Sequence, residues 1–280
     1  MAGYGVLYLA ATFAAALALH RLAPSAPRWA NYISHGVLWI VGVWLVTWLV
    51  RTKVNRQPWR GMATPAPQLG RFLLGFAVGA ALLLSVFAVQ FGLGWLRVSG
   101  TAALTSAGPR IALALLPSFG VGFCEELAFR GYVLQVLGER MPVWAAAGLT
   151  ALIFAMFHLT LGGFGPGFVV TVIGLSLTFT LLRFATGSLW FPMGVHAAWD
   201  WVQVYLVGVS NVGSPPGHDP ALVRVTQSGP GLWVGQAPSI EGGLIYALAV
   251  AGALAAAYGY AAARGRLPLW MRPLLPDGSQ

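Results

Sequence analysis

Two adjacent glutamates and an arginine lie inside a long apolar stretch of the chain. Glu125, Glu126 and Arg130 are the only charged residues in the run 111–137. Placing a charge in membrane hydrocarbon costs from about 3 to about 10 kcal/mol or more, so such residues usually face a protein-lined or watery cavity. Glu126 and Arg130 are four residues apart and share a helix face, whereas Glu125 is rotated by about 100°. We expect Arg130 to neutralise one carboxylate while the other points into a cavity; a structural clamp of all three residues is the alternative.

Two histidines lie in later apolar stretches. His196 and Asp200 are four residues apart on one helix face, where they could bind a metal together or orient each other's proton. A buried aspartate with no Lys or Arg nearby in the sequence needs a partner. His158 follows Phe154 by four residues, and by itself it is more typical of a hydrogen-bonded packing residue than of a catalyst.

Carboxylates and histidines that gather inside a membrane suit hydrolysis by activated water. A glutamate would act as the general base, a histidine would share or shuttle the proton, and the remaining groups would stabilise an oxyanion or hold a metal. No serine or cysteine is placed as a nucleophile, since Ser118 and Cys124 lie near the glutamates without a histidine partner in the sequence. The ionisable residues come from three separate apolar runs. They can act together only if the three helices place them at the same depth in the membrane.

The composition indicates a polytopic membrane protein. Of the 280 residues, 58% are hydrophobic and 8% are charged, whereas a soluble domain carries roughly 25% charge. The net charge of +9 does not indicate nucleic-acid binding, because the 16 Lys and Arg lie mostly between apolar runs, where they act as topology signals and contact anionic lipid. The single cysteine, Cys124, excludes an intrachain disulfide and a cysteine-rich metal site.

The fold class that we expect is all-α, with about eight transmembrane helices around an intramembrane active-site cavity. Apolar runs of spanning length lie at about residues 3–20, 33–50, 71–95, 111–137, 143–161, 166–186, 189–209 and 242–263. The loop between the second and third runs is basic and is therefore expected to be cytoplasmic. Threading eight spans from that loop places both termini in the cytoplasm.

The chain divides into three parts within one domain. Residues 1–110 hold three transmembrane helices and the basic cytoplasmic loop, and residues 111–209 hold the catalytic core of four transmembrane helices. Residues 210–280 hold an external loop, the last transmembrane helix and a short cytoplasmic tail. The loop, about 210–241, is rich in Gly, Pro and Ser, so we expect little regular structure there.

Three motifs follow one another in the order of a known family. The resemblance rests on Glu125-Glu126-x-x-x-Arg130, Phe154-x-x-x-His158 and His196-x-x-x-Asp200. Together with their flanking residues, they resemble the core of the CPBP family, the CAAX-protease and bacteriocin-processing intramembrane endopeptidases. The likeness covers about residues 111–205.

The resemblance implies roles for these positions. Catalytic positions would be Glu125, Glu126, His158, His196 and Asp200, with Arg130 and Phe154 in support. Glu125 would be the base, assisted by His158. An amide stands at the last position in the prenyl-protease branch, whereas Asp200 stands here. An ionised carboxylate would repel an oxyanion, so Asp200 must be protonated, orient His196 or bind a cation.

The resemblance leaves two mechanisms open, one that uses a metal ion and one that does not. His158, His196 and Asp200 would supply three ligands for Zn²⁺ and leave a position for water. The motifs lack the His-Glu-x-x-His helix of zinc proteases, and a metal-free glutamate mechanism would serve as well.

The function that we expect is hydrolysis of a peptide bond by an integral membrane endopeptidase, in the cytoplasmic membrane of a bacterium. Its partners would be membrane lipids and a peptide or membrane-protein substrate, such as a CAAX tail, a pheromone or a bacteriocin leader. A non-catalytic immunity or scaffolding protein of the same fold is one alternative. A proton- or cation-coupled transporter is another, although no internal repeat supports it.

Overall fold

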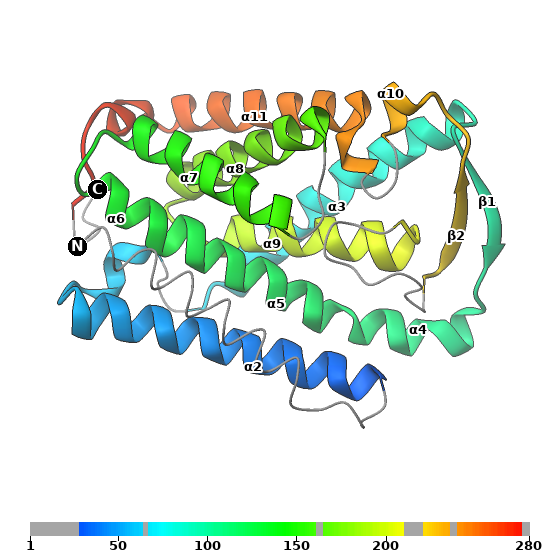
Figure 1. Cartoon of the computed structure of the whole chain (residues 1–280), viewed down its shortest axis with the longest axis horizontal. Coiled ribbons are helices and arrows are strands. Elements are labelled where there is room, and N and C mark those ends of the chain that lie inside the picture. The colour runs from blue at the N-terminus through cyan, green and yellow to red at the C-terminus, as the bar shows by residue number, and fades with distance from the viewer. Residues whose placement is uncertain (1–27, 64–66, 161–164, 210–220, 236–239, 276–280) are drawn as a thin grey trace.

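The structure, a computed structural model, describes residues 28–63, 67–160, 165–209, 221–235 and 240–275. Helices run side by side along the long axis, and a two-stranded ribbon closes one end of the bundle (Figure 1). The opposite end is formed by α6 and the ends of α2 and α11 (Figure 1). We refer to these as the β-ribbon end and the α6 end.

The elements of the first half lead to the first motif. They are α2 (Arg28–Leu49), η1 (Val50–Val54), η2 (Trp59–Met62), α3 (Leu69–Gly92), β1 (Leu96–Thr101), α4 (Leu104–Leu113), α5 (Leu115–Glu125), η3 (Glu126–Val133) and α6 (Leu134–Gly138). Of these, η1 and η3 are π-helical, and η2 is a 3₁₀ turn.

The elements of the second half carry the other two motifs and the last long helix. They are α7 (Val143–Thr160), α8 (Pro166–Thr186), α9 (Trp190–Asp200), η4 (Trp201–Leu206), β2 (Val223–Gln227), α10 (Gly231–Val234), η5 (Ile240–Gly242), α11 (Leu244–Ala263) and η6 (Leu267–Met271). Of these, η4 is π-helical and continues α9.

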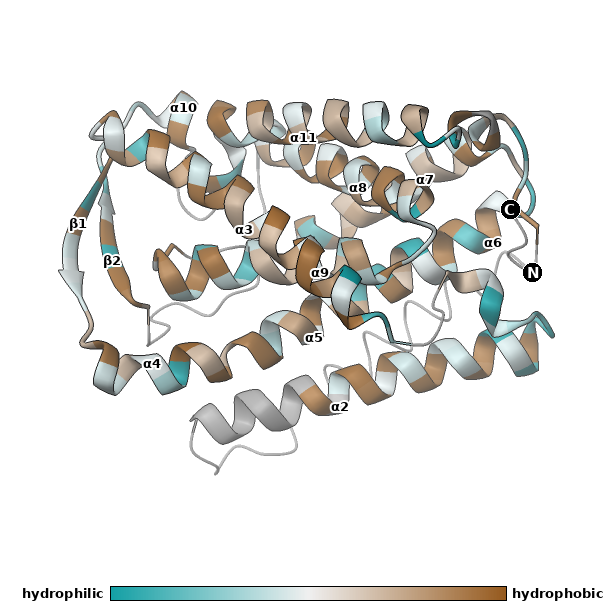
Figure 2. Ribbon diagram, turned by 180° about the vertical axis from the view of Figure 1, so that it is seen from behind, coloured by the Kyte–Doolittle hydropathy of each residue, from teal (hydrophilic) through white to brown (hydrophobic). Residues whose placement is uncertain are grey.

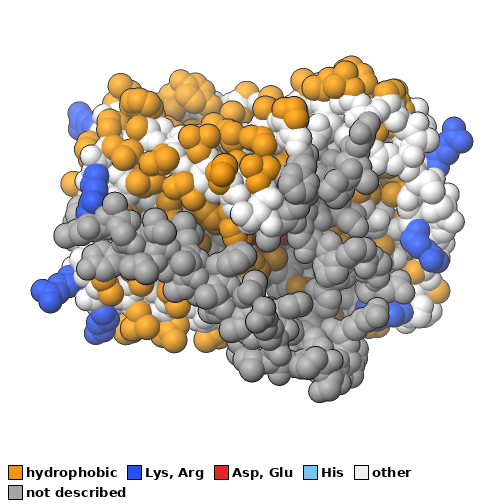
Figure 3. All heavy atoms as spheres, in the orientation of Figure 1, with side chains coloured by type: hydrophobic (Ala, Val, Ile, Leu, Met, Phe, Trp, Pro, Cys, Tyr) orange, Lys and Arg blue, Asp and Glu red, His pale blue; other side chains and the backbone are white. Residues whose placement is uncertain are grey.

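Five helical segments of the described residues are long and apolar enough to cross a membrane. They are Leu69–Gly92, Leu104–Gly138, Val143–Thr160, Pro166–Thr186 and Leu244–Ala263. Hydrophilic residues gather where α2 and α11 end (Figure 2), and Lys and Arg lie at both ends of the molecule with hydrophobic side chains between them (Figure 3). The protein is therefore an integral membrane protein.

The remaining three spans of the expected eight stay a prediction. The run 3–20 lies outside the described residues, and the run 33–50 falls on α2 and η1. The run 189–209 forms α9 and η4, which together are shorter than a typical span.

Regular structure in the loop before α11 corrects one expectation. We expected little of it in 210–241, yet β2 pairs with β1 in an antiparallel ribbon, with Val98 opposite Val225 and an irregularity between Val98 and Gly100. A short helix, α10, and the 3₁₀ turn η5 follow. The prediction was wrong for the described part of this loop because its partner strand lies more than 120 residues earlier. Alternating β-branched residues in Val223–Gln227 suit such pairing.

Glycines let α9 pack deep between α3 and α5. A Cβ atom at Gly194 would collide with the backbone oxygen of Phe72 in α3, and one at Gly122 in α5 would lie 2.9 Å from the oxygen of Met193. Backbones can approach this closely only where a side chain is missing. The close packing fixes the depth of α9, and with it the position of His196.

Candidate active site

Glu126 and Arg130 form a buried ion pair in η3. The Nη1 atom of Arg130 lies 2.8 Å from Oε1 of Glu126, and both side chains are fully buried. The guanidinium lies over the ring of Phe154 at 4.2 Å and that of Phe179 at 5.2 Å from the ring centroids. The two aromatic rings hold the arginine in place while the carboxylate balances its charge. π-Helical turns such as η3 occur often at functional sites.

His196 is oriented by the same carboxylate. Its Nδ1 atom lies 3.0 Å from Oε1 of Glu126, and its ring stacks on Phe179 with the centroids 5.1 Å apart. Because Oε1 also accepts the bond from Arg130, it is the charged acceptor and Nδ1 is the donor. The Nε2 atom of His196 is therefore left to face the other acids.

His158 is held in a similar way by its backbone. Its Nδ1 atom donates to the carbonyl oxygen of Phe154 at 2.9 Å, since a carbonyl can only accept. In neutral His158 the Nε2 atom then carries a lone pair. Phe154, predicted as a supporting residue, contacts both the ring of His158 and the guanidinium of Arg130.

Glu125 lies where the two histidines meet. Its Oε2 atom is 3.8 Å from Nε2 of His158 and 3.8 Å from Nε2 of His196. Asp200 is also near His196, with Oδ2 at 3.9 Å from the same Nε2 atom. These distances exceed a direct hydrogen bond.

The structure thus brings all five predicted ionisable residues into one cluster. Arg130 pairs with Glu126, and Glu125 faces the histidines, as the helical spacing leads one to expect. Glu125 and Glu126 are buried, whereas the side chains of His158 and Asp200 are 16% and 13% exposed.

Glu241 is a member of this region that the sequence interpretation missed. It was placed in a solvated loop, yet it is only 8% exposed. The Nε1 atom of Trp199 and the Nε2 atom of Gln203 both donate to its Oε1 atom at 3.3 Å. Burial raises the pKa of the Glu241 carboxyl, and the charge of Asp200 raises it further. Its one visible sequence signal is an acid immediately before an apolar helix.

Phe179 is the second missed residue. It stacks on His196 and lies under Arg130, so it helps to orient both. In the sequence it is one aromatic residue among many in an apolar run, and no local pattern distinguishes it.

Whether His158, His196 and Asp200 bind Zn²⁺ stays a prediction. Among the residues that the structure describes, no three His, Cys, Asp or Glu side chains are arranged to hold a metal ion. The Nδ1 atoms of His158 and His196 are engaged by Phe154 and Glu126, and both Nε2 atoms face Glu125. We therefore derive no step through a metal.

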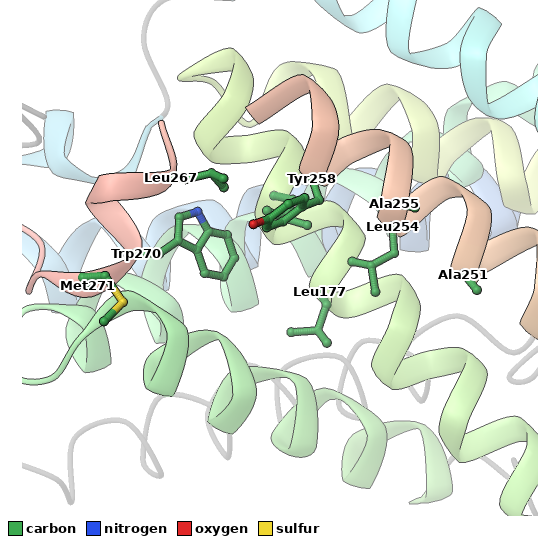
Figure 4. A pocket seen from close by; sticks show the side chains of 9 residues that line it. Leu177, Ala251, Leu254, Ala255, Tyr258, Leu267, Trp270 and Met271 are labelled. Carbon is green, nitrogen blue, oxygen red and sulfur yellow. The ribbon is translucent and has the colours of Figure 1, made fainter. Parts of the chain in front are cut away.

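An apolar groove on the outside of α8 and α11 is separate from the cluster. It has a volume of about 640 Å³, and Figure 4 shows its wall to be almost entirely aliphatic and aromatic. No residue of the three motifs lines it. It lacks the acids and bases that hydrolysis needs.

Comparison with known proteins finds a family that matches part of the chain. Residues 106–202, about a third of the chain, match a family model described as Type II CAAX prenyl endopeptidase Rce1-like. The matched segment runs from α4 to the start of η4 and includes all three motifs. A search of curated proteins found no match. Over residues 106–202, which carry all three motifs, the chain is therefore similar to the CAAX-protease-like membrane proteins of the CPBP family.

Proposed function

We propose that the protein is an intramembrane endopeptidase that hydrolyses a peptide bond with water activated at Glu125. The observation that carries the proposal is the position of Glu125 Oε2, at 3.8 Å from the Nε2 atoms of both His158 and His196. A water molecule that binds beside these atoms would have a base, Glu125, and a proton carrier, His158, within reach. General acid–base catalysis of this kind contributes about 10²- to 10⁴-fold in rate.

The chemical steps follow from the atoms that face the water. Glu125 takes a proton from the water as its oxygen attacks the substrate carbonyl carbon. The resulting oxyanion accepts hydrogen bonds from protonated Nε2 of His196 and from a protonated Asp200 carboxyl. As the carbon–nitrogen bond breaks, the proton passes from Glu125 through His158 to the leaving amine. An oxyanion donor is typically worth about 10²- to 10³-fold in rate.

Glu126 and Arg130 act as the frame for His196. Their 2.8 Å ion pair fixes Oε1 of Glu126, which in turn orients the histidine at 3.0 Å. A carboxylate that holds Nδ1–H also favours the protonated imidazole that can donate from Nε2. The frame does not touch the water in this scheme.

The substrate class follows from the setting of the site. Glu125, Glu126 and His158 lie in segments that are long and apolar enough to cross a membrane. We infer that the scissile bond lies within or at the edge of the bilayer, in a peptide or a membrane-protein tail. We place the protein in a bacterial cytoplasmic membrane, among its lipids, with both termini in the cytoplasm. The basic loop around Arg51 and Lys53 supports this orientation.

Comparative peptidomics tests the proposal. Membranes that carry wild type, Glu125→Gln or Glu139→Gln are compared for cleaved peptides. Glu139 is a matched control, because it is an ion-paired carboxylate at the α6 end, far from the motifs. Products should appear with wild type and the control and be absent with Glu125→Gln. Identical products, or none, in all three would favour a scaffold, and ion flux that depends on Glu125 and Asp200 would favour a transporter.

A further inference from the structure

Arg183 is a buried cation near the end of α8, and it is only 4% exposed. Its Nη2 atom donates to Oε1 of Gln135 in α6 at 2.9 Å and to the carbonyl oxygen of Gly61 in η2 at 3.5 Å. Its Nε and Nη1 atoms are buried and have no hydrogen-bond partner in the described part of the chain. A guanidinium stays protonated in proteins. Arg183 therefore brings a positive charge and unpaired donors into the interior of the α6 end.

The carboxylate at the α6 end is already engaged by other groups. Oε1 of Glu139 accepts from Nη1 of Arg51 at 2.8 Å and from Nε2 of Gln135 at 3.1 Å. Gln135 lies between Glu139 and Arg183, because its amide nitrogen donates to the first and its amide oxygen accepts from the second. The other acids that the structure describes belong to the active-site region, namely Glu125, Glu126, Asp200 and Glu241. Among the described residues, the α6 end thus buries two guanidinium groups, those of Arg51 and Arg183, against one carboxylate.

This excess of positive charge calls for an anion. A water molecule can accept a hydrogen bond from an unpaired N–H group, but it leaves the charge of Arg183 without compensation. A buried charge is costly unless an opposite charge lies beside it. We propose that the α6 end binds a small inorganic anion, such as chloride, against the unpaired donors of Arg183. Such an ion accepts a hydrogen bond from the guanidinium and neutralises its charge at the same time.

The enclosure of Arg183 favours a free ion over the headgroup of a lipid. The guanidinium is held by Gln135 and by the backbone of Gly61, and it lies 5.1 Å from the ring centroid of Phe184. A phosphodiester that carries two acyl chains would have to open these contacts, whereas a monatomic ion is only slightly larger than a water molecule. No residue of the three motifs takes part. The proposal is therefore independent of the proposed peptidase function.

Thermal melting in exchanged anions tests the site. The purified full-length protein is melted in a neutral detergent while sodium gluconate is replaced by sodium chloride at constant ionic strength. We expect the melting temperature of wild type to rise with chloride until it saturates, by at least about 2 °C, because the ion binds the folded chain. Arg183→Gln should lose this rise. Arg110→Gln is the matched control and should keep it, since Arg110 is exposed in α4 and donates to the carbonyl of Ser106.

Equilibrium dialysis against radioactive chloride measures binding directly. Arg110→Gln should bind chloride as wild type does, whereas Arg183→Gln should bind it at least about tenfold more weakly, because the amide carries no charge. Arg183→Lys separates a lost charge from a damaged fold. It keeps a cation at this position, so it should bind chloride more tightly than Arg183→Gln does.

Several results would overturn the proposal. One is a melting temperature of wild type that does not respond to chloride, and another is an equal rise in Arg183→Gln. Equal binding of chloride by wild type and Arg183→Gln in the dialysis would do the same. In phosphatidylcholine liposomes without chloride, stabilisation by added phosphatidylglycerol that Arg183→Gln abolishes would show that the anion is a lipid headgroup. Absence of peptide cleavage by wild type would refute the peptidase function and leave the anion site standing.

Discussion

Two of the buried polar regions in the described part of the bundle are built differently. At the α6 end, Arg51 lies 2.8 Å from Glu139, and Arg183 donates to Gln135 at 2.9 Å. Gln135 in turn donates to the carbonyl of Leu275 at 3.0 Å. These direct bonds tie η1, α6, α8 and the tail together across long stretches of sequence.

The active-site cluster combines a bonded frame with open positions. Glu126, Arg130 and His196 are joined by direct bonds, as at the α6 end. Around Glu125 and Asp200, however, the acid–histidine distances are 3.8 to 3.9 Å. The buried Oε2 atom of Glu125 has no direct hydrogen-bond partner among the described residues, so it is able to engage a reacting molecule. We infer that the α6-end network serves stability, and we propose that the cluster serves chemistry.

The largest effect is expected from a change that separates α9 from α3. In Gly194→Ala the new Cβ would collide with the backbone of Phe72, so the helices must move apart and His196 with them. We expect loss of activity and of at least about 1–3 kcal/mol of stability. Gly252→Ala in α11, where a Cβ meets nothing within 4 Å, is the control and should remain folded. Thermal melting and peptide cleavage are measured together; equal behaviour of both variants would refute the packing argument.

Exchanging arginine for lysine in each region sharpens the comparison. Lysine carries a compact ammonium group in place of the planar guanidinium of arginine, so Arg130→Lys should misorient Glu126 and His196. We expect kcat to fall about 10- to 100-fold with little change in KM. Arg183→Lys at the α6 end should lower the melting temperature and leave kcat within about twofold. Steady-state kinetics of both variants measure these effects. An equal loss of kcat in the two variants would contradict the claim that the two regions have different roles.

Breaking the ion pair at the α6 end should affect stability alone. Arg51→Gln removes the cation opposite Glu139, whose side chain is 17% exposed, so a cost of about 1–3 kcal/mol is expected. Adding Glu139→Gln should recover part of this cost, because the carboxylate is no longer left without its partner. Chemical denaturation measures the free energy of unfolding of the single and the double variant. Strictly additive losses would mean that the two side chains do not interact.

Metal removal is expected to have the smallest effect. We propose that the described residues carry out hydrolysis without a metal, so dialysis against a chelator should leave kcat within about twofold. The metal content of the same samples is assayed. Loss of activity that Zn²⁺ restores would contradict this prediction and return His158, His196 and Asp200 to the role of ligands.

Local helix geometry explains what could be predicted from the sequence. The pairing of Glu126 with Arg130, the separate direction of Glu125 and the nearness of Phe154 to His158 all follow from residues four or one apart on a helix. The apolar runs likewise predicted the five spanning segments seen among the described residues. These features need no knowledge of tertiary structure.

Long-range contacts explain what could not be predicted. The π-helical turns, the stacking of Phe179 on His196, the ribbon between β1 and β2 and the burial of Glu241 each depend on segments distant in the sequence. Glu241 is the most instructive example, because a loop rich in Gly and Pro suggested a solvated acid. The fold turns it inward against Trp199 and Gln203.

The most direct test of the account follows one turnover of a purified substrate in heavy-oxygen water. Wild type in liposomes should place heavy oxygen in the new carboxyl terminus during the first turnover, since water attacks the peptide bond directly. Glu125→Gln should be slower by about 10²- to 10⁴-fold, while Glu139→Gln keeps the wild-type rate. Cleavage by Glu125→Gln at the wild-type rate, or a first-turnover product without heavy oxygen, would contradict the claim that Glu125 activates the water.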